Sequence, residues 1–142
     1  MHAGDQAPLF RKVDCLHIPV PELEAGLSFY CDQLGHELLW RTTTAAGLRM
    51  PDTDTELVLQ TERPEVEVNL LVTSVDVAIT AITRAGGTVI EPPFDIQIGR
   101  CAVVQDPWGN QLVLVDHSKG LLATDEEGNV IGNIPTKNSS DL

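Results

Sequence analysis

Cysteine is scarce in this chain and scattered along it. The 142 residues include three cysteines, Cys15, Cys31 and Cys101, which are too few for a disulfide framework and too far apart for a Cys-x-x-Cys metal knuckle. No apolar run approaches the roughly 20 residues that a membrane-spanning helix needs, and residues 1–11 lack the apolar segment of a signal peptide. The simplest prediction is a reduced, cytoplasmic protein.

Basic residues are also scarce. Nine lysines and arginines stand against 21 aspartates and glutamates, which gives a net charge of -12 at pH 7. A surface of that sign repels nucleic acid phosphates and anionic lipids, so we expect neither nucleic acid nor a membrane as a partner. The length and the apolar content of 42% are ordinary for one soluble globular domain.

Two segments of the chain have helical periodicity, with apolar residues recurring every three or four positions. Each segment follows a strand-like run, VDCLHIPV or VEVNLLV, and each precedes three further strand candidates. The apolar positions are Leu23, Leu27, Tyr30 and Leu34 in the first segment and Val75, Ile79, Ile82 and Ala85 in the second.

The two halves of the chain superimpose at an offset of 52 residues, which places Val20 on Val72 and Leu27 on Ile79. We therefore predict a duplicated βαβββ unit and an α+β fold. The single domain spans residues 12–116, with module one at 12–62 and module two at 65–116. A C-terminal extension, residues 117–142, lies outside the repeat.

Three stretches carry a resemblance to a known family: VDCLHIPVPELEAGLSFYCDQLGHEL, AITRAGGTVIEPPF and GRCAVVQDPWGNQLVLVD. The pattern of the first helix and the DPWGN turn are similar to those of the vicinal oxygen chelate superfamily, which includes glyoxalase I, bleomycin-resistance proteins and extradiol dioxygenases. The resemblance implies two tandem βαβββ modules that form a curved mixed sheet around a cleft. Such a cleft is built within one chain or across a dimer, and we expect a homodimer.

Catalytic members of that superfamily hold a divalent metal with His and Glu side chains on four cleft-facing strands. The resemblance carries those four positions to Cys15, Glu56, Glu67 and Val113. Valine cannot bind a metal, and one thiol with two carboxylates mixes soft and hard donors. We therefore predict no cofactor. A divalent metal is the alternative, because His17 faces the same side of its strand as Cys15.

The same register predicts which side chains face the cleft and bind a ligand. Cys15 is expected as a small buried hydrophobe and His17 as a hydrogen-bonded wall residue, with a ligand or redox role as the alternative. Glu56 and Glu67 either lie on a solvated rim or form an acidic pocket that attracts a cation or supplies a general base. The full set is Cys15, His17, Trp40, Glu56, Gln60, Glu67, Asn69, Arg100, Gln111 and Val113.

The C-terminal extension contains a turn signal, EEGN, between the apolar pairs Leu121-Leu122 and Val130-Ile131. Two interpretations stay open. The segment forms a small hairpin that caps the cleft or docks on a second subunit, or it is a flexible polar extension, especially from Pro135 onward.

Two classes of function compete. The first is a metal-free protein that binds a small organic ligand in its cleft, cationic ligands included, as antibiotic-sequestering members of the superfamily do. The alternative is a divergent lyase or isomerase of the glyoxalase I type, either metal-dependent or with Glu56 or Glu67 as general base. A third class of function is a structural role as a small dimeric interaction module. We favour binding, because the expected metal positions lack histidine.

Overall fold

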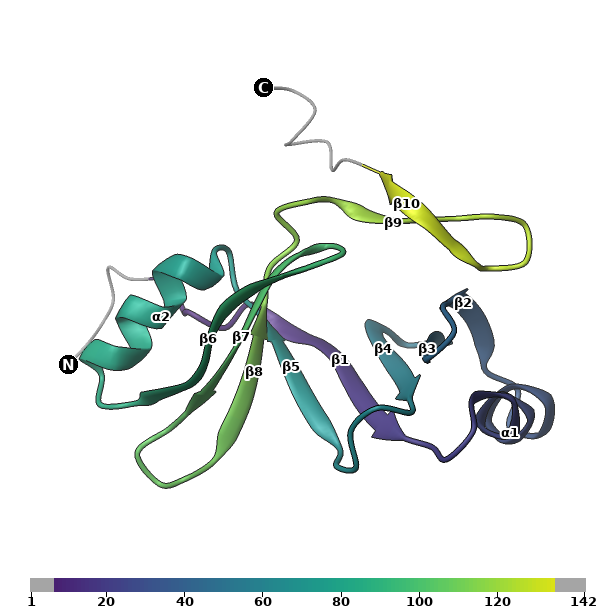
Figure 1. Cartoon of the computed structure of the whole chain (residues 1–142), viewed down its shortest axis with the longest axis horizontal. Coiled ribbons are helices and arrows are strands. Elements are labelled where there is room, and N and C mark those ends of the chain that lie inside the picture. Colours follow the sequence, from purple (N-terminus) through teal and green to yellow (C-terminus); the bar gives the residue numbers. More distant parts are fainter. Residues whose placement is uncertain (1–6, 135–142) are drawn as a thin grey trace.

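The computed structural model describes residues 7–134, which form one eight-stranded mixed sheet, two helical segments and a separate hairpin (Figure 1). The strand order is β2-β3-β4-β1-β5-β8-β7-β6. The strands of the sheet are β1 (Lys12–Pro19), β2 (Glu37–Arg41), β3 (Ala45–Met50), β4 (Thr53–Gln60), β5 (Glu67–Leu71), β6 (Thr88–Ile96), β7 (Gly99–Gln105) and β8 (Gln111–Val115).

The sheet is assembled from two copies of the same βαβββ unit, as the repeat in the sequence predicts. The first strands of the two units, β1 and β5, pair antiparallel at the centre of the sheet. Within each unit the first strand pairs parallel with the last, β1 with β4 and β5 with β8. The α+β fold class is therefore confirmed, with the helical segments of the two units at opposite ends of the sheet (Figure 1).

The second helix, α2 (Val75–Arg84), begins and ends where the sequence predicts. Its first turn is capped by Ser74, whose Oγ accepts a hydrogen bond from the N–H of Val77 at 3.3 Å. Just beyond its end, Gly86 has a φ of 103°, a left-handed conformation that glycine adopts without strain. Among residues 7–134, no helix is long and apolar enough to cross a membrane.

The first helix departs from the regular geometry that its periodicity predicts. After α1 (Leu23–Leu27) the chain widens into a π-helical segment, η1 (Ser28–Gln33). At its end the N–H of Leu34 donates to the carbonyl of Phe29, five residues earlier, at 3.1 Å. The apolar stripe is kept as far as Leu27 and Tyr30, which pack against the core, whereas the last predicted position, Leu34, is 55% exposed.

Each module buries its own apolar cluster beneath its helix. The buried residues of the first cluster are Leu23, Ala46, Leu48 and Leu59, and those of the second are Val72, Val75, Ala78, Ala102, Val104 and Leu114. Because neighbouring residues of a strand face opposite sides, this packing leaves the alternate residues of β1, β4, β5, β7 and β8 on the other, concave face of the sheet.

A hairpin of β9 (Leu121–Thr124) and β10 (Val130–Ile134) follows the sheet. Its turn has the same construction as the DPWGN turn between β7 and β8. In both turns an aspartate, Asp106 or Asp125, accepts hydrogen bonds from the N–H groups two and four residues later, all at 2.9 Å. The Asp-x-x-Gly-Asn pattern therefore builds the hairpin turn from local contacts alone. The predicted flexible end, from Pro135 onward, lies outside the described residues.

The hairpin is joined to the sheet at both of its ends. Near its base, Asn133 Nδ2 donates to the carbonyl of Gln97, between β6 and β7, at 2.8 Å. Near its tip, the N–H of Arg41 in the edge strand β2 donates to the carbonyl of Gly128 at 2.7 Å. The hairpin thus runs from the β6–β7 side of the molecule to β2 (Figure 1).

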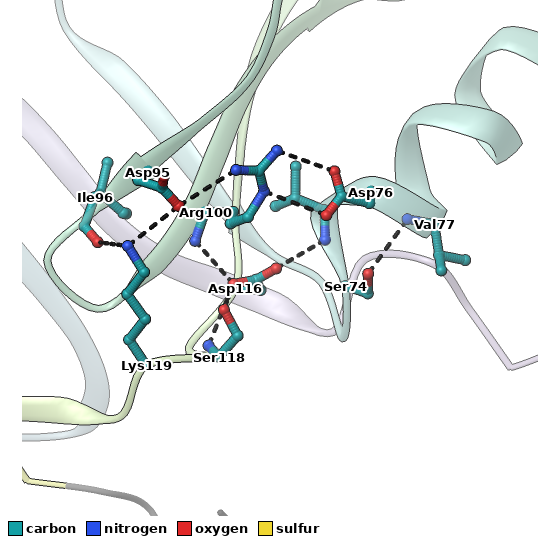
Figure 2. A network of polar contacts seen from close by, with 10 residues as sticks. Ser74, Asp76, Val77, Asp95, Ile96, Arg100, Asp116, Ser118 and Lys119 are labelled. Atoms are coloured by element: carbon teal, nitrogen blue, oxygen red, sulfur yellow. Dashed lines mark hydrogen bonds and ion pairs between the residues drawn. The ribbon is translucent and has the colours of Figure 1, made fainter.

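A buried carboxylate, Asp116, joins the end of β8 to its surroundings (Figure 2). Its Oδ2 accepts from the N–H of Val75, the first residue of α2, at 2.9 Å. Its Oδ1 accepts from the N–H of Arg100 at 2.9 Å and from the Ser118 hydroxyl at 2.8 Å. Burial alone would raise the pKa of Asp116, but these hydrogen bonds hold it below its ordinary value.

We predict that Asp116→Asn lowers the free energy of unfolding by about 2–4 kcal/mol at pH 7, because the amide turns a donor toward a buried N–H group. A lowered native pKa stabilises the fold above the unfolded pKa and ceases to do so as the pH falls through the native value. The deficit of the variant should therefore shrink below about pH 4. Urea unfolding across this pH range measures it.

Asp32→Asn is the matched control, since Asp32 is exposed on η1. It should unfold like the wild type at every pH. A deficit for Asp116→Asn that stays constant down to pH 2 would contradict the role given to the ionised carboxylate.

Candidate functional site

The concave face of the sheet and the hairpin enclose a cleft of about 940 Å³. The floor comes from both modules, and Leu121, Leu122, Thr124 and Val130 of the hairpin contribute to its lining. The predicted residues that line the cleft are Cys15, His17, Trp40, Glu56, Gln60, Glu67, Asn69 and Val113. The register inferred from the sequence therefore brings most of the predicted set together.

Two predicted residues lie elsewhere. Arg100 does not line the cleft, because Cys101 and Val103 do, and its neighbour in the strand must face the helix side. Its guanidinium pairs with Asp76 at 3.2 Å and with Asp95 at 3.3 Å (Figure 2). The expectation that Arg100 faces the cleft is wrong.

Gln111 is the second residue outside the lining. It shares a face with Val113, but it opens β8 and is exposed beyond the end of the cleft. Its partner across the sheet is Gln105, the last residue of β7. The alternation along β8 therefore predicts correctly which face of the sheet the Gln111 side chain lies on. It does not predict that the cleft ends before this residue.

A row of four side chains crosses the floor from one module to the other. Cys15 is paired with Glu56 on one side and with Asn69 on the other, and Asn69 is paired with Val113. Asn69 is only 4% exposed, and its Nδ2 has no hydrogen-bond partner among the described residues. Burial raises the pKa of the Cys15 thiol far above its ordinary range, so this group is a protonated, inert part of the floor.

Trp40 and Glu56 form a hydrogen-bonded pair at the module-one end of this row. Trp40 Nε1 donates to Glu56 Oε1 at 2.8 Å. The indole lies against Gly47, the residue paired with Trp40 in β3, where a Cβ would overlap the ring. Burial raises the pKa of Glu56, partly offset by the hydrogen bond from Trp40. Among the described residues, no cationic side chain lies within 4.0 Å of this carboxylate.

Glu67 and His17 belong to a separate group that is already paired. Arg63 Nε donates to both carboxylate oxygens of Glu67 at 3.0 Å, and Arg63 Nη2 lies 3.0 Å from His17 Nδ1. Gln60 holds this arrangement, since its side chain bonds the N–H and the carbonyl of Arg63 at 2.8 Å. Burial and the Arg63 charge lower the pKa of His17. Glu67 is therefore an ion-pair partner rather than a free carboxylate.

Asp14 and His117 form a third polar group, which is not among the residues predicted from the sequence. His117 Nε2 lies 3.0 Å from Asp14 Oδ1, and both residues line the cleft. The contact with Asp14 raises the pKa of His117. Alternation from Val113 and Val115 continues to residue 117 and could have located His117. Asp14 reaches the cleft because the pairing of β1 with β5 is irregular between Val13 and Cys15, which no sequence signal indicates.

Comparison with protein-family models identifies the family. The model of the Glyoxalase/Bleomycin resistance protein/Dioxygenase superfamily matches residues 12–114. The chain belongs to this superfamily. No curated protein sequence matches the chain.

Solved structures of the same fold include two epimerases. A methylmalonyl-CoA epimerase from Mycobacterium tuberculosis is 19% identical, with a TM-score of 0.66 over 81% of this chain and 95% of that one. A Streptomyces coelicolor methylmalonyl-CoA epimerase in complex with 2-nitronate-propionyl-CoA is 20% identical, with a TM-score of 0.64 over 77% and 99% of the two chains. At these identities the likeness establishes the fold alone.

The metal positions of the superfamily do not fit a metal in this chain. The pairing of Asn69 with Val113 in module two matches that of His17 with Val58 in module one, since 17 and 69 are equivalent in the repeat. The position equivalent to Val113 is therefore Val58, and not Glu56 as the sequence suggested. Two of the four positions are valines, and a third is the protonated thiol of Cys15. Among residues 7–134, no three His, Cys, Asp or Glu side chains lie close enough to hold a metal ion.

We predict that Cys15→His alone creates no stoichiometric site for Ni²⁺ or Zn²⁺, because Val58 and Val113 still leave two corners without a donor. A triple variant that adds Val58→Glu and Val113→Glu supplies donors at all four positions with Glu67, and it should bind metal. Isothermal titration calorimetry on folded, chelator-treated protein compares the two. Tight binding of one equivalent by the single variant would show that the positions are assigned wrongly.

Proposed function

We propose that this superfamily member binds a small organic molecule in its cleft without a metal. The observation that carries the proposal is the cleft itself, a space of about 940 Å³ between the sheet and the hairpin. Pockets of roughly 300–1,000 Å³ are the size that encloses most of the surface of a drug-sized ligand. The valines at two metal positions turn the centre of this space into a surface for apolar contact.

The walls combine apolar area with few polar groups, as in most small-molecule sites. The apolar side chains come from both modules and the hairpin: Leu39, Val58, Phe94, Ile96, Ile98, Val103, Val113, Val115, Leu121, Leu122 and Val130. A protein that sequesters a ligand needs only affinity for that ligand and no catalytic group. Sequestration of an antibiotic, known in the superfamily, is one function that requires nothing more.

The charges of the lining disfavour a phosphorylated ligand such as a coenzyme A ester. Six carboxylate side chains line the cleft against three from lysine and arginine. All three are already paired: Lys12 with Asp54 at 2.7 Å, Arg63 with Glu67 at 3.0 Å and Arg49 with Glu37 at 3.1 Å. The epimerases of the same fold are therefore a weak guide to the ligand of this chain.

We predict that Val113→Trp abolishes binding of every cleft ligand, because the indole fills the centre of the floor. A fragment library screened by ligand-observed NMR, against protein treated with a chelator, identifies the ligands. Val77→Trp is the matched control, since Val77 is 67% exposed on α2, and it should leave binding unchanged.

The two variants need equal far-UV circular dichroism for the comparison to hold. If the wild type binds fragments only after a metal is added back, the proposal is wrong. It is equally wrong if Val113→Trp binds the same fragments as the wild type.

The Asp14–His117 pair favours a second candidate function, a metal-independent isomerase. An imidazole held by a carboxylate in a cleft is a suitable general base for a carbon-bound proton next to a carbonyl group. Glu56, whose carboxyl has a raised pKa and faces the same cleft, is placed to donate a proton to the carbonyl oxygen. In this candidate function the proton leaves carbon for His117 and a solvent proton returns to the same carbon.

If this candidate is correct, fragments with an acidic C–H bond exchange that hydrogen in D₂O when the protein is added, and one-dimensional NMR follows the loss of signal. We predict that His117→Gln stops the exchange while the fragments still bind. His36→Gln is the control, since His36 contacts the carbonyl of Arg49 outside the cleft. Exchange that continues at the wild-type rate in His117→Gln would exclude a base role for this residue.

A further inference from the structure

Glu56 differs from the other acidic residues of the cleft, because those are either paired with a basic group or, like Glu62 and Glu91, exposed to solvent. Asp54, Glu67 and Asp14 each have a basic partner within 3.0 Å, namely Lys12, Arg63 and His117. Glu56 is half-buried and, within the described part of the chain, its side chain has one hydrogen-bond partner, the indole N–H of Trp40, and no ion-pair partner within 4.0 Å. A carboxylate withdrawn from water without a counter-charge costs free energy that a cation from outside the chain would recover.

Trp40 adds an aromatic surface beside this carboxylate. Gly47 supports the ring, because the absence of a Cβ there lets the indole lie flat on β3. Trp40 lines the cleft together with Thr124 and Val130 of the hairpin. The Glu56 carboxylate meets the edge of the indole through Nε1, and a ring face not covered by Gly47 would attract an organic cation in the same direction as that negative charge.

Asn69 supplies a polar group on the other side of Cys15. Its side chain is 96% buried at the centre of the floor, and its Nδ2 has no partner in the described structure. Neighbouring strands are about 4.8 Å apart, so Asn69 and Glu56, two strands apart, are separated by roughly 10 Å. A molecule with its charged end at Glu56 and a hydrogen-bonding group several bonds away would reach both.

We propose that the ligand of the cleft is an organic cation, such as an amidinium or a quaternary ammonium, held between the Glu56 carboxylate and the Trp40 ring. This proposal rests on the proposed function and specifies its ligand class. Its apolar part occupies the valine-lined centre, where related proteins hold a metal. The hairpin closes the space above it.

Benzamidine and benzamide provide the test, because they share a shape and differ in charge. We expect benzamidine to bind at least about tenfold more tightly than benzamide to the wild type, measured by calorimetry at pH 7.5. Glu56→Gln should make the two affinities equal. Trp40→Leu should weaken benzamidine more than benzamide. Glu65→Gln is the matched control, since it removes an exposed carboxylate that does not line the cleft, and it should keep the preference.

The pH dependence gives a second readout. The titratable groups that face Glu56 are Asp14 and Cys15 on β1, Arg49 on β3 and His117 after β8. A cation binds the ionised carboxylate, so benzamidine affinity should rise with pH through the pKa of Glu56, and binding should release protons into the buffer. Glu56→Gln should abolish this dependence, whereas His117→Gln should retain it.

The outcomes separate this proposal from the function on which it rests. Equal affinities of benzamidine and benzamide for the wild type overturn the cation proposal and leave small-molecule binding intact. If the wild type binds only neutral fragments, and Val113→Trp abolishes that binding, the cation proposal is again overturned and small-molecule binding stands. If no fragment of either charge binds, both proposals fail.

Discussion

The antiparallel pairing of β1 with β5 is the interaction on which the rest of the structure depends. These are the first strands of two equivalent modules, and their pairing makes one continuous sheet from two small ones. It also decides which side chains share the concave face. Cys15 and Asn69 come from different modules and become neighbours there, with Glu56 beyond one and Val113 beyond the other. Any chemistry in the cleft therefore belongs to both modules at once.

By resemblance, catalytic members of the superfamily hold a metal on this shared face, and this chain keeps the face without a full set of metal ligands. Valines at two equivalent positions and a protonated thiol at a third leave an apolar centre. Polar groups remain around that centre, in three separate pairs. In two of them a carboxylate is paired with a basic side chain, whereas the Glu56 carboxylate is bonded only to the Trp40 N–H and has no ion-pair partner among the described residues. This difference is what favours an organic cation over an anion or a metal.

The fold and the cleft could be predicted from the sequence because they depend on periodicity. The repeat at an offset of 52 and the alternation along each strand gave the modules, the strand faces and eight of the lining residues. The predictions failed where the position of a side chain depends on how two strands pair and not only on its place in the sequence. The irregular pairing beside Val13 turns Asp14 into the cleft, and the pairing of β1 with β4 makes Val58 the equivalent of Val113. Arg100 lies on the helix side because its neighbour Cys101 faces the cleft. These placements are set by contacts between strands, which the sequence pattern alone does not specify.

The position of the hairpin is another feature that could not be predicted from the sequence. Its turn is encoded locally by the Asp-x-x-Gly-Asn pattern, but its place over the cleft depends on a few contacts with distant residues, two hydrogen bonds between Asn133 and Gln97 and one from the backbone of Arg41. A crystal structure of the wild-type protein, purified without chelators and soaked with benzamidine, tests the central claim most directly. We expect an amidinium between Glu56 and Trp40, with the benzamidine ring over Val113, and no metal ion. A metal ion bound by Cys15 and Glu67 on the cleft floor would contradict it.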